Sequence, residues 1–163
     1  VISHSYRGAG AFKILYPIVK AESWLKKGYS EKWYYQKQGQ LVQNAWVKDN
    51  GNWYFMNDKG VMFNQTWLYQ GGNWYAFKSS GAMIASDWLY DNNSWYYLKD
   101  SGAMATGWVK DSGSWYYLKD SGAMTTGWVK DGGQWYYLDS TGKMLHNTYT
   151  PDGYYVDASG AWK

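Results

Sequence analysis

Tryptophan and tyrosine are the residues of this sequence whose type and spacing suggest chemistry. The 163 residues include 13 Trp and 18 Tyr. Trp recurs at steps of 20 or 21 residues, and a second Trp follows seven residues after each. Ring faces that converge on a gap can hold a quaternary ammonium by cation–π attraction, a sugar through its C–H faces, or a stacked nucleic-acid base. The regular pairs are Trp46 and Trp53, Trp67 and Trp74, Trp88 and Trp95, Trp108 and Trp115, and Trp128 and Trp135; an earlier pair, Trp24 and Trp33, is spaced by nine residues.

The other side chains give little support for an enzyme. The two histidines, His4 and His146, are far apart in sequence, and there is no cysteine. Glutamate occurs only as Glu22 and Glu31, whereas a glycosidase needs two carboxylates held across one bond. The repeated aspartates fall in turns, where Asp is favoured for local hydrogen bonding. We therefore expect no catalytic residue, no metal site and no cofactor.

Short β-hairpins are expected to position the rings. The clearest unit, from Thr106 to Met124, reads TGWVKDSGSWYYLKDSGAM. Two runs of strand-forming residues, 108–110 and 115–118, are separated by turn residues, which predicts a hairpin. In the second turn, Gly122 is available for a positive φ.

Strand alternation divides each hairpin into two faces. Trp115 and Tyr117 are expected on one face, and Tyr116 and Leu118 on the other. A lone hairpin is marginal in water, so the repeat predicts an all-β solenoid of stacked hairpins that bury their faces against one another. We interpret the tyrosines in the middle of the second strands as core packing: Tyr34, Tyr54, Tyr75, Tyr96, Tyr116 and Tyr136.

The charge and the hydropathy of the sequence argue against two further classes, nucleic-acid-binding proteins and membrane-spanning proteins. The net charge of +3 is mild and mixed, and the only arginine is Arg7, which argues against nucleic acid as a partner. No apolar run approaches the ~18 residues of a membrane span.

Residues 1–10 lack the layout of a signal peptide, which favours a mature or trimmed form. Residues 1–23 lie outside the repeat and are expected to form a cap or another non-repeat segment, and exposed lysines near the turns are expected to be solvated.

The unit GWVKDSGSWYYLKDSGAMTTG resembles the choline-binding repeats, or cell-wall-binding repeats, of surface proteins of pneumococci and their phages. The resemblance covers residues 24–163 and implies about six repeats plus a degenerate C-terminal unit, wound into a left-handed β-solenoid. It also implies a secreted, non-catalytic module of a Gram-positive surface. Such a module anchors to choline or phosphocholine on cell-wall teichoic and lipoteichoic acids, with host proteins or glycans as further partners.

Members of this family hold choline between successive hairpins, with two Trp from one repeat, a Tyr from the next and often a Met. The resemblance implies three complete sets here: Trp67, Trp74, Tyr97 and Met104; Trp88, Trp95, Tyr117 and Met124; and Trp108, Trp115, Tyr137 and Met144. It implies partial sites at Trp24 and Trp33 with Phe55, at Trp46 and Trp53 facing Ala76, and at Trp128 and Trp135 facing Val156.

Two alternatives stay open at this point. Related repeats occur in streptococcal glucan-binding domains, so the ligand could be a glucan or a host glycan. The chain could also be the attachment fragment of a wall hydrolase whose catalytic domain is absent.

Overall fold

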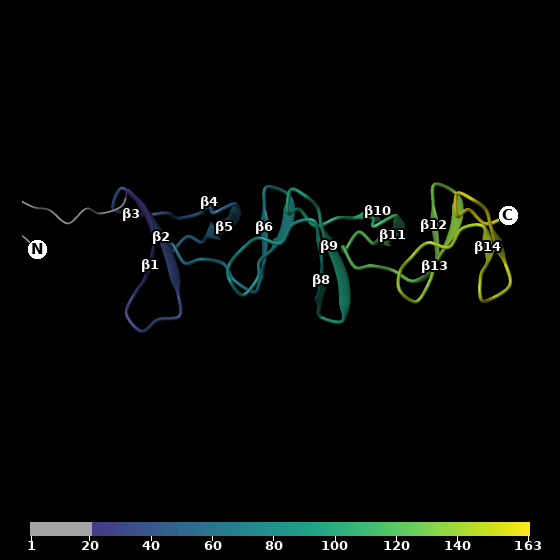
Figure 1. Cartoon of the computed structure of the whole chain (residues 1–163), viewed down its shortest axis with the longest axis horizontal. Coiled ribbons are helices and arrows are strands. Elements are labelled where there is room, and N and C mark those ends of the chain that lie inside the picture. Colours follow the sequence, from purple (N-terminus) through teal and green to yellow (C-terminus); the bar gives the residue numbers. More distant parts are fainter. Residues whose placement is uncertain (1–20) are drawn as a thin grey trace, which may run out of the picture. The chain divides into compact units, whose positions relative to one another are not determined.

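The computed structural model describes residues 21–163, and its regular structure is entirely β (Figure 1). Most of the predicted non-repeat segment 1–23, including His4 and Arg7, lies outside the described residues. The chain divides into two compact units, one that ends at Phe63 and one that runs from Asn64 to Lys163. No helix that could cross a membrane occurs within residues 21–163.

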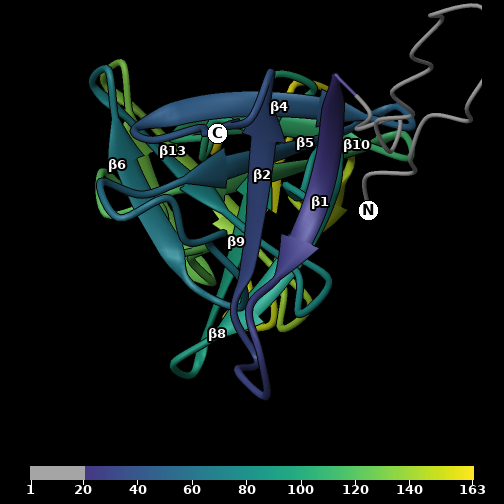
Figure 2. The ribbon, with the colours of Figure 1, turned by 90° about the vertical axis from the view of Figure 1, so that its left-hand side faces the viewer.

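The first unit contains a three-stranded sheet and a hairpin. β1 (Glu22–Lys26) pairs antiparallel with β2 (Trp33–Lys37), as Figure 2 shows, and β3 (Gln40–Leu41) lies along the other edge of β2. β4 (Ala45–Asp49) and β5 (Asn52–Met56) form the hairpin.

The second unit is a succession of two-stranded antiparallel hairpins. The last hairpin has strands of only two residues, which are separated by residues 150–154. The hairpins are β6 (Trp67–Gln70) with β7 (Asn73–Ala76), β8 (Asp87–Asp91) with β9 (Ser94–Leu98), β10 (Gly107–Asp111) with β11 (Ser114–Leu118), β12 (Gly127–Asp131) with β13 (Gln134–Leu138), and β14 (Thr148–Tyr149) with β15 (Tyr155–Val156).

The strand register assigns the side chains of each hairpin to two faces. In β10–β11, Trp108 lies opposite Tyr117, and Lys110 lies opposite Trp115. Since successive side chains point to opposite faces, these four residues share one face, and Tyr116 lies on the other. The register agrees with the predicted alternation.

Neighbouring hairpins of the second unit are joined through buried aliphatic residues and backbone hydrogen bonds. Leu98, Leu118, Leu138 and Val156 occupy equivalent positions and are at most 1% exposed. The loop after each hairpin reaches back to the preceding one: the Met104 N–H donates to the Trp74 carbonyl oxygen at 2.8 Å, and the same bond recurs in the later repeats. These bonds fix the spacing between adjacent Trp-bearing strands.

Candidate ligand-binding sites

A cavity of about 360 Å³ lies between the β6–β7 and β8–β9 hairpins. Two tryptophans of the first hairpin meet a tyrosine of the next. Trp67 is half-buried, whereas the ring of Trp74 is 43% exposed. The cavity is lined by Trp67, Trp74, Tyr96, Met104, Asp91, Asn92 and Ser121. We use the term ring set for three residues: the two Trp of one hairpin, and the Tyr of the next hairpin that contacts the first of these two Trp.

The tyrosine of each ring set differs from the one that the resemblance implied. Trp67 contacts Tyr96 edge to face, with ring centroids 5.2 Å apart. In the next two sets, Trp88 contacts Tyr116 at 4.9 Å and Trp108 contacts Tyr136 at 5.0 Å. The expected residues Tyr97, Tyr117 and Tyr137 instead contact the first Trp of their own hairpins, Trp88, Trp108 and Trp128, at 5.0–5.2 Å.

Strand alternation explains this difference. Tyr97 lies directly opposite Trp88 in the register of its hairpin, so the two rings share a face. Only a residue on the other face, such as Tyr96, can point back to the preceding hairpin. Burial, assisted by the nearby Asp111 carboxylate, raises the pKa of the Tyr97 hydroxyl. Of the middle tyrosines, which we expected to be core packing, Tyr96 lines the cavity of the Trp67 ring set.

An aspartate lies beside each ring set. From the sequence, we expected these aspartates only to form turns. The indole Nε1–H of Trp67 donates to Asp91 Oδ2 at 3.0 Å. A partly buried indole N–H needs such an acceptor, and the bond fixes the orientation of the ring. The bond recurs from Trp88 to Asp111, from Trp108 to Asp131 and from Trp128 to Asp152. The signal in the sequence was an Asp placed 23 or 24 residues after each of these tryptophans.

The first unit contains a ring set of the same kind. Trp24 contacts Tyr54 at 4.8 Å and donates its Nε1–H to Asp49 Oδ2 at 3.1 Å. The implied partner Phe55 contacts Trp46 of its own hairpin at 5.1 Å. Trp33 is linked to this set because its carbonyl oxygen accepts from Met62 N–H. Trp46 and Trp53 form an edge-to-face pair at 6.4 Å.

The last ring set is bounded by an additional aromatic residue. Trp128 contacts Tyr154 at 5.8 Å, whereas the implied partner Val156 is completely buried. Trp162 occupies the position that Met has in the other repeats, and its N–H donates to the Trp135 carbonyl oxygen. Hydrogen bonds from Thr150 and then Trp128 lower the pKa of Asp152. An open cavity of about 350 Å³ is lined by Asp152 and four rings: Trp128, Trp135, Tyr154 and Trp162.

Family models match most of the repeated part of the chain. Residues 90–126 and 125–162 match models described as choline-binding repeats, and residues 44–62 and 65–83 match one described as a cell wall binding repeat. The chain belongs to the choline-binding repeat family. The ring set of Trp67, Trp74 and Tyr96 therefore joins two of the matched segments, 65–83 and 90–126.

Solved structures show the same relationship. Choline binding protein F from Streptococcus pneumoniae is 41% identical over 86% of this chain and 47% of its own, with a TM-score of 0.73. The pneumococcal cell wall endolysin from phage Cp-1, solved in complex with choline, is 43% identical over 74% of this chain and 37% of its own, with a TM-score of 0.57. The chain thus spans half or less of the length of these two relatives. No curated protein matches it.

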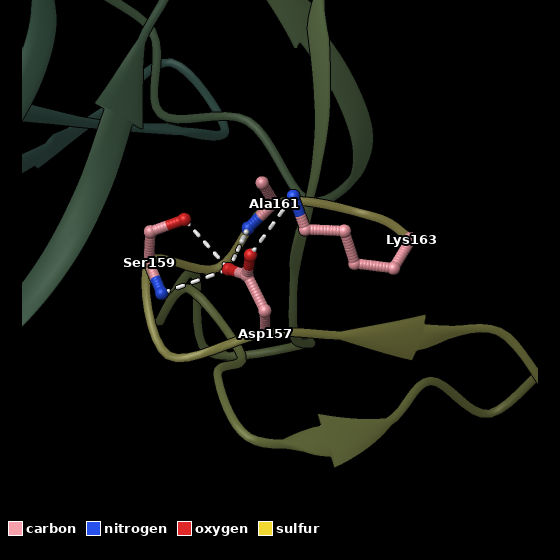
Figure 3. Close-up of polar contacts among 4 residues, drawn as sticks. All are labelled: Asp157, Ser159, Ala161 and Lys163. Atoms are coloured by element: carbon pink, nitrogen blue, oxygen red, sulfur yellow. Dashed lines mark hydrogen bonds and ion pairs between the residues drawn. The ribbon is translucent and has the colours of Figure 1, made fainter.

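In the last choline-binding repeat, Asp157 organises the turn that carries Trp162 (Figure 3). Its Oδ1 accepts from the Ser159 hydroxyl at 2.6 Å and from the backbone N–H groups of Ser159 and Ala161 at 2.8 and 3.1 Å. Lys163 Nζ lies 3.3 Å from Oδ2. The hydrogen bond from the Ser159 hydroxyl is the largest of the effects that lower the pKa of Asp157 from its ordinary 3.8 to about 2.

We expect the contribution of Asp157 to the last repeat to be lost in acid. Because its folded pKa lies below the unfolded value of about 3.9, its stabilisation is fully present above about pH 4 and disappears as the pH falls through about 2. The Ala161 amide resonance should titrate with that midpoint. Asp157→Asn should abolish the titration, and Asp120→Asn, in the equivalent turn of an earlier repeat, should not. A titration that survives in Asp157→Asn would contradict the assignment.

Proposed function

We propose that the chain binds choline groups of cell-wall polymers, with the quaternary ammonium held in the ring sets. The observation that carries this proposal is the repeated arrangement of a half-buried Trp, an exposed Trp and a Tyr of the next hairpin, as in Trp67, Trp74 and Tyr96. A cation within about 6 Å of a ring face gains roughly 0.5–2 kcal/mol per ring. Three rings therefore give a weak individual site.

The carboxylates beside the ring sets favour a cation over a neutral sugar. Asp91 lines the cavity of the Trp67 set, and its charge attracts an ammonium group at short range. The rings also meet edge to face, at 70° between Trp67 and Tyr96, and thus surround a gap instead of forming a flat platform.

We infer that the repeats of residues 24–163 form a left-handed β-solenoid of a secreted, cell-wall-associated protein. The family models and the pneumococcal relatives support this inference. The polymers proposed as partners are teichoic and lipoteichoic acids that carry phosphocholine. Successive sites would engage one polymer with high effective concentration, which can raise avidity ~10²–10⁴-fold over one site. These residues act by attachment, and wall hydrolysis would require a separate catalytic domain.

Choline should stabilise the chain more than a neutral molecule of the same shape. Ligand bound only to the folded state adds RT ln(1 + [L]/Kd) per site, about 1.4 kcal/mol at ten times Kd. We expect the melting temperature to rise steadily with choline chloride. It should change little with 3,3-dimethylbutan-1-ol, in which a tert-butyl group replaces the trimethylammonium, or with sodium chloride at equal ionic strength. Equal shifts with the neutral alcohol, or a shift with soluble glucan alone, would overturn the proposal.

A further inference from the structure

The ring set of Trp108, Trp115 and Tyr136 adjoins a second, more polar cavity of about 270 Å³. Trp115 belongs to this ring set, and Met144 is bonded to it, because the Met144 N–H donates to the Trp115 carbonyl oxygen at 2.8 Å. The cavity is lined by these two residues together with Lys110, Ser114, His146 and Ser159. A group bound against Trp115 can thus extend directly into surroundings that contain an ammonium, an imidazole and hydroxyl groups.

Two of these polar residues distinguish this repeat from others in the second unit. Lys110 lies opposite Trp115 in the hairpin, with Nζ 5.8 Å from the ring centroid. The equivalent residues of the two preceding hairpins are Tyr69 and Tyr90, whose rings lie 5.1 and 5.0 Å from the rings of Trp74 and Trp95. His146 follows Met144 by two residues, at the position where the two preceding repeats have threonine: Thr106 and Thr126.

Three donors of this cavity are not engaged by carboxylates. Within residues 21–163, neither Lys110 nor His146 forms an ion pair, and His146 makes no side-chain hydrogen bond. The Ser159 hydroxyl already donates to Asp157, which leaves the Lys110 ammonium, a His146 ring N–H and the Ser114 hydroxyl as free donors. No aspartate or glutamate lines the cavity. Such a group of donors suits a phosphate oxygen.

We propose that this cavity binds the phosphate of a choline phosphodiester whose ammonium occupies the adjoining ring set. The proposal rests on the proposed function, since it requires the ammonium to be bound against Trp115. Only two carbons and an ester oxygen separate the ammonium nitrogen of phosphocholine from its phosphorus, so the two groups must occupy adjoining spaces. The Trp67 ring set, with Tyr69 and Thr106 at the equivalent positions, has no such cations and would recognise the ammonium alone. We assign the phosphodiester to a wall polymer, because part of the chain matches a cell wall binding repeat.

The test compares choline with glycerophosphocholine at two individual sites. Indole N–H resonances of Trp115 and Trp74, assigned with Trp115→Phe and Trp74→Phe, are followed during titration at about 0.15 M salt, where long-range charge effects are screened. Glycerophosphocholine should bind about 3- to 10-fold more tightly than choline at Trp115, as expected of charge-assisted hydrogen bonds at a partly exposed site. At Trp74 the two ligands should bind equally.

The chain itself supplies the matched variants. Lys110→Tyr with His146→Thr introduces the residues that other repeats carry, at two exposed positions, and should remove the preference for glycerophosphocholine at Trp115, measured as the ratio of the two dissociation constants there. An equal preference at both tryptophans, or a preference that survives the double substitution, would overturn the inference. Absence of choline binding at Trp74 would contradict the proposed function instead. Cosedimentation with phosphatidylcholine vesicles would contradict the assignment of the diester to a wall polymer.

Discussion

Replacing Tyr116 by leucine should weaken choline binding at the Trp88 ring set about tenfold, near the upper end of what one ring contributes. Tyr116 is the ring of the following hairpin that contacts Trp88, at a centroid distance of 4.9 Å. Leucine keeps the apolar volume but removes the π face. The loss should be seen as a reduced response of the Trp95 indole resonance to choline, with the other tryptophans largely unaffected.

The neighbouring residue supplies the matched control. Tyr117 contacts Trp108 of its own hairpin at 5.0 Å, so Tyr117→Leu should leave the Trp95 response unchanged and affect only Trp108 and Trp115. If Tyr117→Leu abolishes the Trp95 response and Tyr116→Leu does not, the third ring is the one that the family resemblance implied.

Replacing Gly122 by alanine should destabilise the chain by about 2–3 kcal/mol, mostly from backbone strain with a smaller addition from overpacking. Gly122 has φ +85°, where an L-residue is strained by ~1–2 kcal/mol. An added Cβ would also overlap Met104 Sδ and lie 2.7 Å from its Cε. Because Sδ and Cε are the flexible end of the Met104 side chain, their displacement adds only ~1 kcal/mol, the lower end of the overpacking range. Urea unfolding monitored by tryptophan fluorescence measures the total.

Gly113 separates the two contributions. Its φ of +84° is nearly identical, yet a Cβ there would meet nothing within 4 Å. Gly113→Ala should therefore cost only the backbone strain, ~1–2 kcal/mol, and leave ligand binding unchanged. Gly122→Ala should also alter choline binding at the Trp67 ring set, because Met104 lines that cavity. Equal destabilisation by the two variants would show that the Met104–Gly122 contact contributes nothing.

Much of the local structure could be predicted from the sequence because its causes are local. The period of two, the β-forming runs and the turn residues determine each hairpin, and the register of β10–β11 agrees with the predicted faces. Gly122 adopts the positive φ for which the sequence made it available. The spacing of the Trp pairs also identified the rings that line the cavities of the Trp67 and Trp128 sets.

The strand alternation predicted from the sequence already favoured a different tyrosine from the one that the family resemblance implied. If Trp115 and Tyr117 share one face, a ring that points back toward the preceding hairpin must come from the other face, where Tyr116 lies. The same reasoning favours Tyr54 over Phe55 as the partner of Trp24. In the structure, the tyrosine that contacts the first Trp of the preceding hairpin lies one residue before the one that the resemblance implied, and a shift of one residue reverses the face.

The sequence by itself determined which residues form hairpins, which share a face and which tryptophans recur, since these follow from interactions between residues close along the chain. Only the tertiary structure decided which residues meet across successive hairpins: the aspartate that accepts each indole N–H, the entry of Trp162 into the last ring set and the convergence of Lys110 and His146 beside Trp115. The physical reason is that these contacts join residues 20 to 50 positions apart, whose meeting depends on how one hairpin is set against the next, and local periodicity does not specify that arrangement.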